Sequence, residues 1–435
     1  MRMRSCVRLL ILFATMLGLL VAGPAFAAKQ TVKVGFLGPL TGGNSGIGVG
    51  GRNSAELAVI ERNANPKAKY HYEFVALDDE CKPNVGVQVG TKMAADKKII
   101  ATVAHYCSAV ALAVVDIYHR FGLPVVIWGA VQPNITYGND YPEIMRICGT
   151  LVNQNEQAAK FMRSQGYKKF AIIHDTSDYG KSHKEYFEKY ITEFGGEVLG
   201  VYGVTTEQQD FTAELTQIKA MNPEVLYFGG LTPLGVRIRT QMEKLGINAQ
   251  FEGVSGIKSE PYIEGLGKEL AEGTLSFSEA APVADLPLGQ KFLASYDAQK
   301  FGQGPDAYGA FAYAGMVQVL DAIEKEGPDR KKVLAHIGAT KDEDTLVGKV
   351  TYDSHGQNIV ATIFKYVVQD GQWVVWEKSE YASGKRHLKH PGAAAPKAAA
   401  APASAPAAAP EAAKSEAAPA AAPAPAAPAA EAPKK

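Results

Sequence analysis

The sequence is poor in cysteine and has no excess of charge of either sign. Four cysteines occur in 435 residues, with no pair of CxxC motifs and no His/Cys cluster at metal-ligand spacing, so we expect no metal site. The 45 basic side chains balance the 45 acidic ones. The chain therefore lacks the excess of positive charge that binding to nucleic acid or to an anionic membrane would need.

Signatures of catalysis are also missing. The G-x-S-x-G, H-E-x-x-H and Walker A motifs do not occur, and His105, His174 and His183 are isolated from one another. His174 ends a predicted strand and is the best candidate for a general base, but no matched nucleophile accompanies it. We therefore expect a hydrogen-bonded structural histidine, no cofactor and no enzyme activity.

A glycine-rich segment, Gly46–Gly51, matches the G-x-G-x-x-G pattern of dinucleotide-binding folds. In those folds the glycines form the turn directly after the strand. Here the predicted strand ends near Leu37 and a polar loop intervenes. We interpret the segment as a flexible loop that caps a helix.

The first 27 residues have the pattern of a secretory leader. Three arginines precede an apolar run, Leu9–Val21, and Ala25-Phe26-Ala27 has the small-x-small form of a cleavage site. A membrane anchor is the alternative, but the run is short for a span and ends in Gly23-Pro24. We predict cleavage after Ala27, export to the periplasm and no stable membrane insertion.

The mature chain keeps three cysteines, so at least one is unpaired. Cys148 lies in an apolar, strand-like run and is predicted to be a buried, inert thiol. Cys81 and Cys107 each lie at the end of a predicted strand. If they are bridged, which the exported compartment permits, they would staple two loops together.

The alternation of short apolar runs with longer amphipathic ones predicts βαβ units and parallel sheets, that is, an α/β fold. The predicted strands are Val32–Leu37, Tyr72–Leu77, Ile99–Val103, Val125–Ile127, Phe170–Ile173, Val198–Val204, Val225–Phe228, Thr274–Phe277, Gly348–Tyr352, Ile359–Val368 and Gln372–Trp376. Asp370-Gly371 between the last two is a hairpin signal.

The pattern forms two blocks with a seam near residues 146–153, and late elements return to both blocks. This organisation predicts two lobes with a cleft between them. We expect residues 28–148 plus about 276–352 in the first lobe, and 149–275 plus about 353–390 in the second. Residues 391–435 are almost entirely Ala and Pro with scattered charges, which predicts a disordered tail.

Polar and glycine-rich segments follow several of the predicted strands, where parallel α/β proteins bind their ligands. Cys107-Ser108 begins a helix, and Ser108 is a candidate N-cap at a helix end that offers free N–H groups to an anion. Segments 128–133, 175–180 and 306–308 are further candidates for ligand contact.

Together these segments resemble the leucine/isoleucine/valine-binding protein family, the type I periplasmic binding proteins of ABC transporters. The resemblance covers about residues 31–376. It rests on Gly38-Pro39-Leu40-Thr41-Gly42, Asp78-Asp79-Glu80-Cys81-Lys82-Pro83, Cys107-Ser108, Asp175-Thr176-Ser177-Asp178-Tyr179-Gly180, Gln209-Asp210-Phe211 and Phe228-Gly229-Gly230. It implies two lobes joined by three hinge crossings, a Cys81–Cys107 disulfide, and closure of the lobes on one solute.

The resemblance also implies a set of ligand-binding positions: Ser108, Gly129, Val131, Tyr179, Ser255, Tyr308 and Ile47. Ser108 would hold the ligand carboxylate, assisted by backbone groups of Gly129 and Val131. Tyr179 would cap the ligand from the second lobe, while Tyr308 and Ile47 would line the side-chain pocket.

Two of these positions and one further residue, Leu231, depart from the family pattern. Val131 replaces a threonine, Leu231 replaces a tyrosine, and Ser255 stands where the family's glutamate pairs with the ligand ammonium. A buried ammonium without a carboxylate partner costs several kcal/mol. Four acids in the chain are candidates to replace that glutamate: Glu252, Glu260, Glu279 and Asp306.

The sequence therefore predicts the solute-binding component of an ABC importer, acting as a monomer that docks on permease subunits. Its solute would be a small carboxylate, with a branched-chain or other hydrophobic amino acid first. One alternative is an aromatic or aliphatic carboxylate that lacks the amine. Another is a sensory ligand-binding protein of the same fold, which would need a separate signalling partner.

Overall fold

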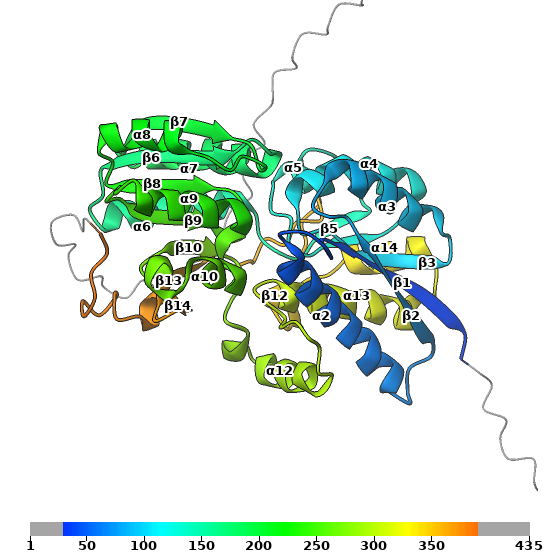
Figure 1. Ribbon diagram of the computed structural model, residues 1–435. Helices are drawn as coiled ribbons and strands as arrows, with labels where there is room; N and C mark the ends of the chain where they lie inside the picture. The colour runs from blue at the N-terminus through cyan, green and yellow to red at the C-terminus, as the bar shows by residue number, and fades with distance from the viewer. Residues whose placement is uncertain (1–28, 390–435) are drawn as a thin grey trace, which may run out of the picture.

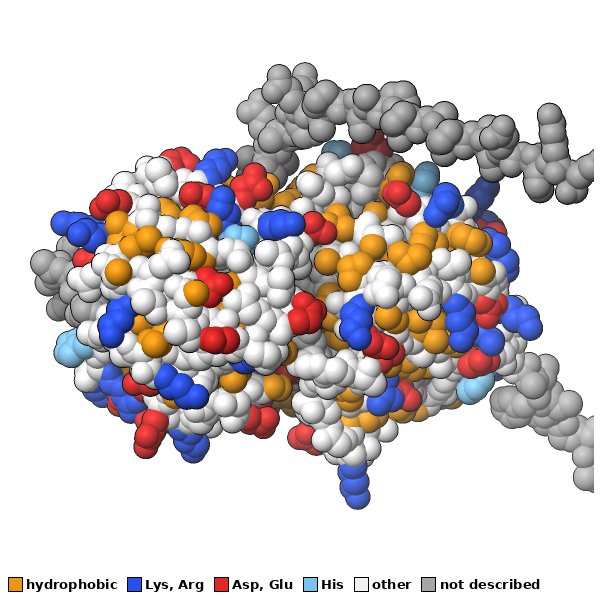
Figure 2. All heavy atoms as spheres, turned by 45° about the horizontal axis from the view of Figure 1, so that its top comes forward, with side chains coloured by type: hydrophobic (Ala, Val, Ile, Leu, Met, Phe, Trp, Pro, Cys, Tyr) orange, Lys and Arg blue, Asp and Glu red, His pale blue; other side chains and the backbone are white. Residues whose placement is uncertain are grey.

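The computed structural model describes residues 29–389, which form two α/β lobes that lie side by side (Figure 1). The predicted leader and the predicted disordered tail lie outside the described residues. None of the helices within residues 29–389 is long and apolar enough to cross a membrane. On the face drawn in Figure 2, basic and acidic side chains are interspersed over both lobes.

The first lobe is built on a five-stranded parallel sheet with the order β2-β1-β3-β4-β5. Its strands are β1 (Thr31–Gly38), β2 (His71–Asp78), β3 (Ile99–Val103), β4 (Val125–Ile127) and β5 (Ile144–Arg146). Every residue of β3 and β4 is buried, because helices cover both faces of the sheet.

Seven helices surround the first sheet. They are α2 (Ser45–Ala64), α3 (Pro83–Ala95), α4 (Ser108–Phe121), α5 (Asn134–Tyr137), α12 (Gly289–Ala298), α13 (Gly309–Glu326) and α14 (Arg330–Gly338). The pairs α3/α4 and α2/α13 pack on opposite faces, so a late segment of the chain completes the core of the first lobe (Figure 1). A short hairpin of β11 (Glu343–Thr345) and β12 (Gly348–Val350) follows α14.

The second lobe is built on a seven-stranded sheet with the order β14-β13-β10-β9-β8-β6-β7. Five strands are parallel: β6 (Lys169–Asp175), β7 (Glu197–Val204), β8 (Val225–Gly229), β9 (Gln250–Val254) and β10 (Leu275–Ser278). The strands β13 (Phe364–Gln369) and β14 (Gln372–Val375) add an antiparallel edge. The predicted turn at Asp370-Gly371 joins them, and both of its residues have positive φ.

Six helices flank the second sheet: α6 (Leu151–Ser164), α7 (Asp178–Glu193), α8 (Thr212–Met221), α9 (Thr232–Lys244), α10 (Glu260–Leu266) and α11 (Lys268–Ala271). Three single turns of 3-10 helix complete the element order: η1 (Ser255–Ile257), η2 (Val283–Asp285) and η3 (Trp376–Lys378). Strand β9 was not predicted, because Gln250, Glu252 and Gly253 interrupt its apolar run.

The chain passes between the two sheets after β5, after β10 and before β13. Strand β10 pairs with β13 as far as Ser278, so the second passage begins after that residue. The last passage follows Asn358, whose N–H donates to the carbonyl of Arg146 at 3.0 Å beside β5. Strand pairing, which composition does not reveal, places these two boundaries.

The glycine-rich segment is helical, so its prediction as a capping loop was wrong. Helix α2 begins at Ser45 and contains Gly46–Gly51. A Cβ atom on Gly48 would lie 1.7 Å from the carbonyl oxygen of Pro39, and one on Gly50 would lie 2.5 Å from that of Gly304. These glycines therefore allow the helix to approach neighbouring backbone, and they form no phosphate-binding turn.

Candidate functional site

A cavity of about 70 Å³ lies between the lobes, and we call it the interlobe cavity. Its lining residues are Cys81, Tyr106, Cys107, Ser108, Ala109, Gly129, Asp175, Ser177, Tyr179, Thr206, Leu231, Ser255 and Tyr308. All except Tyr308 follow the carboxyl end of a strand, where open α/β sheets bind ligands. The volume corresponds to about five water-sized positions, which suits a small solute.

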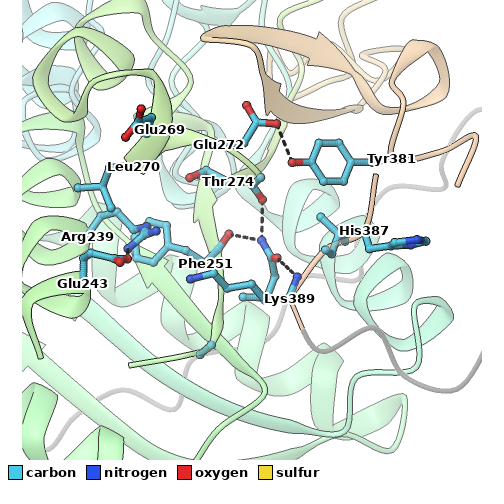
Figure 3. Close-up of a pocket in the computed structure, with 14 residues that line it drawn as sticks. Arg239, Glu243, Phe251, Glu269, Leu270, Glu272, Thr274, Tyr381, His387 and Lys389 are labelled. Atoms are coloured by element: carbon cyan, nitrogen blue, oxygen red, sulfur yellow. Dashed lines mark hydrogen bonds and ion pairs between the residues drawn. The ribbon is translucent and has the colours of Figure 1, made fainter. Parts of the chain in front are cut away.

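A larger cavity of about 500 Å³ lies in the second lobe, at the opposite, amino-terminal ends of β9 and β10 (Figure 3). The protein's own hydrogen bonds cross it. The Gln250 amide donates to the carbonyls of Phe251 (2.9 Å) and Gly273 (2.7 Å), and its oxygen accepts from the Lys389 N–H at 3.2 Å. Tyr381 donates to Glu272 at 2.7 Å. This network fastens the end of the described chain to the sheet, so the interlobe cavity is the better candidate site.

The Cys81–Cys107 disulfide is present, with a Cα–Cα distance of 5.5 Å, as the resemblance implied. Behind it, the Asp79 carboxylate contacts Nδ1 of His105 at 2.7 Å, and Nε2 of His105 contacts the Tyr118 hydroxyl at 2.6 Å. All three side chains are buried. The disulfide and this polar chain brace the rim of the first lobe, and they give His105 a structural role that its isolated place in the sequence did not reveal.

Ser108 lies at the amino end of α4, but it is the first helical residue, and Cys107 occupies the N-cap position. The Ser108 hydroxyl accepts a 3.3 Å hydrogen bond from the N–H of Gln132. The first N–H groups of a fourteen-residue helix therefore lie beside the Ser108 hydroxyl. Such a helix end favours negative charge, so this wall of the cavity suits a carboxylate.

Gly129 also lines the cavity, and a Cβ atom there would lie 2.8 Å from the Tyr106 ring. Val131 and Ile47 do not line it. Val131 is buried, and its carbonyl accepts a hydrogen bond from the Leu151 N–H at 2.9 Å. Ile47 is buried as well, in a hydrophobic cluster that also contains Tyr106 and Tyr308. The structure thus brings five of the seven predicted site residues together around the interlobe cavity.

Three tyrosines dominate the cavity wall. Ser177 caps α7 by accepting from the N–H of Gly180 at 3.3 Å, which orients Tyr179 in the first turn. The Tyr179 hydroxyl accepts from the N–H of Gly256 at 3.0 Å and contacts the Ser255 hydroxyl at 3.3 Å. Burial raises the pKa of Tyr179, so its phenol stays neutral.

The other two tyrosines come from the first lobe. The rings of Tyr106 and Tyr308 meet edge to face at 5.5 Å. Burial also raises the pKa of both phenols. The cavity wall is therefore aromatic and uncharged on this side, with hydroxyl groups as its polar contacts.

Asp175 is the single charged residue among the residues that line the interlobe cavity. It ends β6, and its Oδ1 accepts from both the N–H (2.9 Å) and the hydroxyl of Ser177. Burial raises the pKa of its carboxyl group. A second acid, Glu279, lies behind the wall, where its Oε1 accepts from the Tyr308 hydroxyl at 3.3 Å. Burial raises the pKa of Glu279 to about 7.

None of the four acids named from the sequence lines the cavity. Glu252 faces a separate small cavity in the second lobe, together with Gln154 and His183. Glu260 begins α10 and is exposed. Asp306 is largely buried beside Lys258, and burial raises its pKa to about 6. Only Glu279 contacts a lining residue, Tyr308.

Sequence reasoning assigned no ligand contact to Tyr106 or Thr206. Both come within three residues of a strand's carboxyl end, β3 and β7 respectively, so the rule that found Ser108 could have found them. His174 contacts the backbone oxygen of Asp175 through Nδ1 at 2.7 Å, which fits the structural role predicted for it. Cys148 is buried as predicted, and burial raises the pKa of its thiol.

Comparisons with known proteins agree with this architecture. The sequence model of the periplasmic binding protein family matches residues 31–372. A Leu/Ile/Val-binding protein of Rhizobium johnstonii is 30% identical over 372 residues, which cover 83% of this chain and 99% of that protein. A crystal structure of a leucine binding protein from Thermotoga maritima has a TM-score of 0.73 at 27% identity, covering 79% of this chain and 97% of that one.

A third comparison is a solute binding protein of an ABC transporter from R. palustris, whose crystal structure is a complex with benzoate. Its TM-score is 0.72 at 19% identity, and the match covers 85% of this chain and 99% of that one. At this identity the likeness concerns the fold alone. The two parallel-rich sheets agree with the sequence and structure matches. The chain therefore belongs to the periplasmic binding protein type I family, a family of binding proteins and not of enzymes.

Proposed function

We propose that this protein is the periplasmic solute-binding component of an ABC importer, and that it binds a small carboxylate between its lobes. The observation that carries the proposal is the interlobe cavity itself. It joins the carboxyl ends of both sheets and has the amino end of α4 on one side and Tyr179 on the other.

In this proposal the solute carboxylate binds at the amino end of α4, against the Ser108 hydroxyl. Tyr179 closes the cavity from the second lobe, while Tyr106 and Tyr308 contact the apolar part of the solute. Contact between the lobes already exists next to this site, because the Gln132 amide donates to the Ser182 hydroxyl at 3.3 Å. A solute that touches both lobes stabilises the closed arrangement, which is the form that would dock on the permease.

An amino acid, with a branched-chain or other hydrophobic side chain, is the first candidate solute. The named relatives from Rhizobium johnstonii and Thermotoga maritima bind Leu/Ile/Val and leucine, and their names support this choice. The electrostatics of the cavity support it too. A zwitterion matches a helix amino end on one side and the acids Asp175 and Glu279 on the other.

An aromatic or aliphatic carboxylate without an amine is the second candidate. Two observations favour it: Ser255 provides a hydroxyl and no carboxylate at the end of β9, and three tyrosine rings line the wall. The R. palustris protein bound to benzoate shows that this fold accommodates such an acid in another sequence.

A thermal-shift screen of the mature chain tests the proposal. We would compare leucine with 4-methylpentanoate, its amine-free counterpart, and phenylalanine with benzoate. A ligand at 100 times its Kd stabilises the folded state by about 2.7 kcal/mol, which raises the Tm by several degrees.

Ser108→Ala should weaken binding of the preferred ligand about 10- to 150-fold, since a hydrogen bond to a charged group contributes about 1.5–3 kcal/mol. Unchanged affinity in this variant would contradict the proposed carboxylate position. Recovery of permease subunits in a pull-down with the liganded protein would favour import over the sensory alternative.

A further inference from the structure

Glu279 lies directly behind the interlobe cavity, where its side chain contacts both lobes. It follows β10, where the chain leaves the second sheet, and its side chain is only 4% exposed. Its Oε1 accepts from the Tyr308 hydroxyl of the first lobe at 3.3 Å. Its Oε2 accepts from the Gln154 amide of the second lobe at 2.5 Å. The carboxylate thus holds one group from each lobe.

No cation forms a salt bridge with Glu279 within residues 29–389. Among basic groups, Arg146 lowers the pKa of Glu279. The Arg146 guanidinium, however, donates its hydrogen bonds to neutral oxygens, including the carbonyls of Ala130 and Gln132. A buried carboxylate that lacks a cationic partner is costly. A positive charge on a solute in the adjacent cavity would offset that cost.

Tyr308 connects Glu279 to the cavity. Because the phenol donates its proton to the carboxylate, its oxygen keeps lone pairs that can accept a hydrogen bond from a solute. Tyr308 lines the cavity and Glu279 does not. Glu279 can therefore affect a bound solute only with the Tyr308 phenol between them. The negative charge behind the hydroxyl makes that oxygen a better acceptor for a cationic donor than for a neutral one.

We infer that Glu279 is the specificity-determining acid of this site, and that it selects a solute carrying an ammonium group by acting through Tyr308. The inference rests on the proposed function and adds to it the charge that the solute must carry. Glu279 is a positioning residue, since it touches Tyr308 and not the solute. Two unit charges about 6 Å apart at an effective dielectric constant of about 20 attract strongly enough to change an affinity about 100-fold.

Asp175 is the competing candidate, because it lines the cavity itself. Its Oδ1 is already engaged by two donors of Ser177 at the start of α7. That engagement gives Asp175 a local role in positioning Tyr179, whether or not a solute amine is present. The roles of Asp175 and Glu279 can be distinguished by replacing each in turn. The acid that recognises the amine is the one whose replacement removes the preference for a zwitterion over its amine-free counterpart.

The test is isothermal titration calorimetry of the mature chain at pH 8, where Glu279, whose pKa burial raises to about 7, is ionised. The ligands are leucine and 4-methylpentanoate, and the ratio of the two affinities is taken. Glu279→Gln should lower leucine affinity 10- to 100-fold and leave the affinity for 4-methylpentanoate within about threefold. Glu252→Gln is the matched control, since it alters another buried glutamate of the second lobe that does not line the interlobe cavity. Its affinity ratio should equal that of the wild type.

Two further variants test whether Glu279 acts on the solute through Tyr308 and whether Asp175 is instead the acid that recognises the amine. In a Tyr308→Phe background, Glu279→Gln should change the affinity ratio less than it does in the wild type, because the phenol oxygen that accepts from the solute amine is gone. An unchanged ratio in Glu279→Gln alone would overturn the inference, as would loss of the preference in Asp175→Asn but not in Glu279→Gln. If the wild type bound only amine-free carboxylates, such as benzoate, the inference would fail and the proposed function would stand. If it bound no amino acid and no other small carboxylate, the proposed function itself would fail. Equal loss of both affinities would show a merely structural role.

Discussion

Replacing Glu279 by glutamine should change how the stability of this protein depends on pH. Burial raises the pKa of this carboxyl from 4.5 to about 7 in the folded state. The folded chain therefore binds more protons than the unfolded chain between these two values, and stability falls as pH rises through that window. The contribution of Glu279 is fully present below pH 4.5 and is lost as pH rises past about 7.

The size of this effect follows from the shift. Each pKa unit corresponds to 1.36 kcal/mol, so about 2.5 units correspond to about 3 kcal/mol in total. About 2.5 kcal/mol of that falls between pH 5 and pH 8. Other buried acids, such as Asp175 and Asp306, shift in the same direction, so the wild type alone would not isolate one group. The difference between wild type and Glu279→Gln does isolate it.

The assay is urea denaturation followed by circular dichroism at several values of pH from 5 to 8, without solute. The free energy of unfolding of the wild type should fall relative to that of the variant by about 2.5 kcal/mol across this range. A difference that stays constant with pH would refute the reasoning, because it would mean that Glu279 titrates alike in the folded and unfolded chain. A difference that grows in the opposite direction would mean that a cation stabilises the carboxylate.

Two other predictions concern the rim and the core of the first lobe. The Cys81–Cys107 bond links residues that are 26 apart, so replacing both cysteines by alanine should lower the free energy of unfolding by about 3 kcal/mol in urea denaturation; an unchanged value would show that the bridge adds no stability. Gly48→Ala should destabilise the protein by about 1–3 kcal/mol, because its Cβ would overlap the carbonyl of Pro39. Gly302→Ala, where a Cβ meets open space, is the control and should leave the Tm nearly unchanged.

Much of the fold could be predicted from local patterns. Strands β1 and β3 are rich in apolar residues, and the Asp370-Gly371 turn has residues that tolerate positive φ, so the strands and the turn were recognised. Strand β9 was missed because polar residues and a glycine interrupt it, and its burial depends on neighbours from distant parts of the chain. Gly46–Gly51 was assigned to a loop because glycine disfavours helices, but close contact with Pro39 outweighs that preference.

The residues of the candidate site that come directly after a strand could be predicted from the sequence. Ser108 and Tyr179 could be placed because a parallel sheet brings successive carboxyl ends to one edge. Ile47 and Val131 were assigned by resemblance alone, and neither is among the residues that line the interlobe cavity. Which of the four candidate acids contacts a lining residue could not be chosen from the sequence, because burial and facing partners depend on how the two lobes meet.

The sequence by itself determined the α/β class, the division into two lobes and the strand ends that carry the site, since hydrophobic periodicity and turn residues act locally. Only the tertiary structure decided which late helix completes the first lobe, where the chain crosses between sheets, and which acid lies behind Tyr308. These features arise from contacts between residues far apart in the chain. The environment of Glu279 shows the reason most clearly, because Gln154 and Tyr308 reach it from opposite lobes and burial then sets its charge.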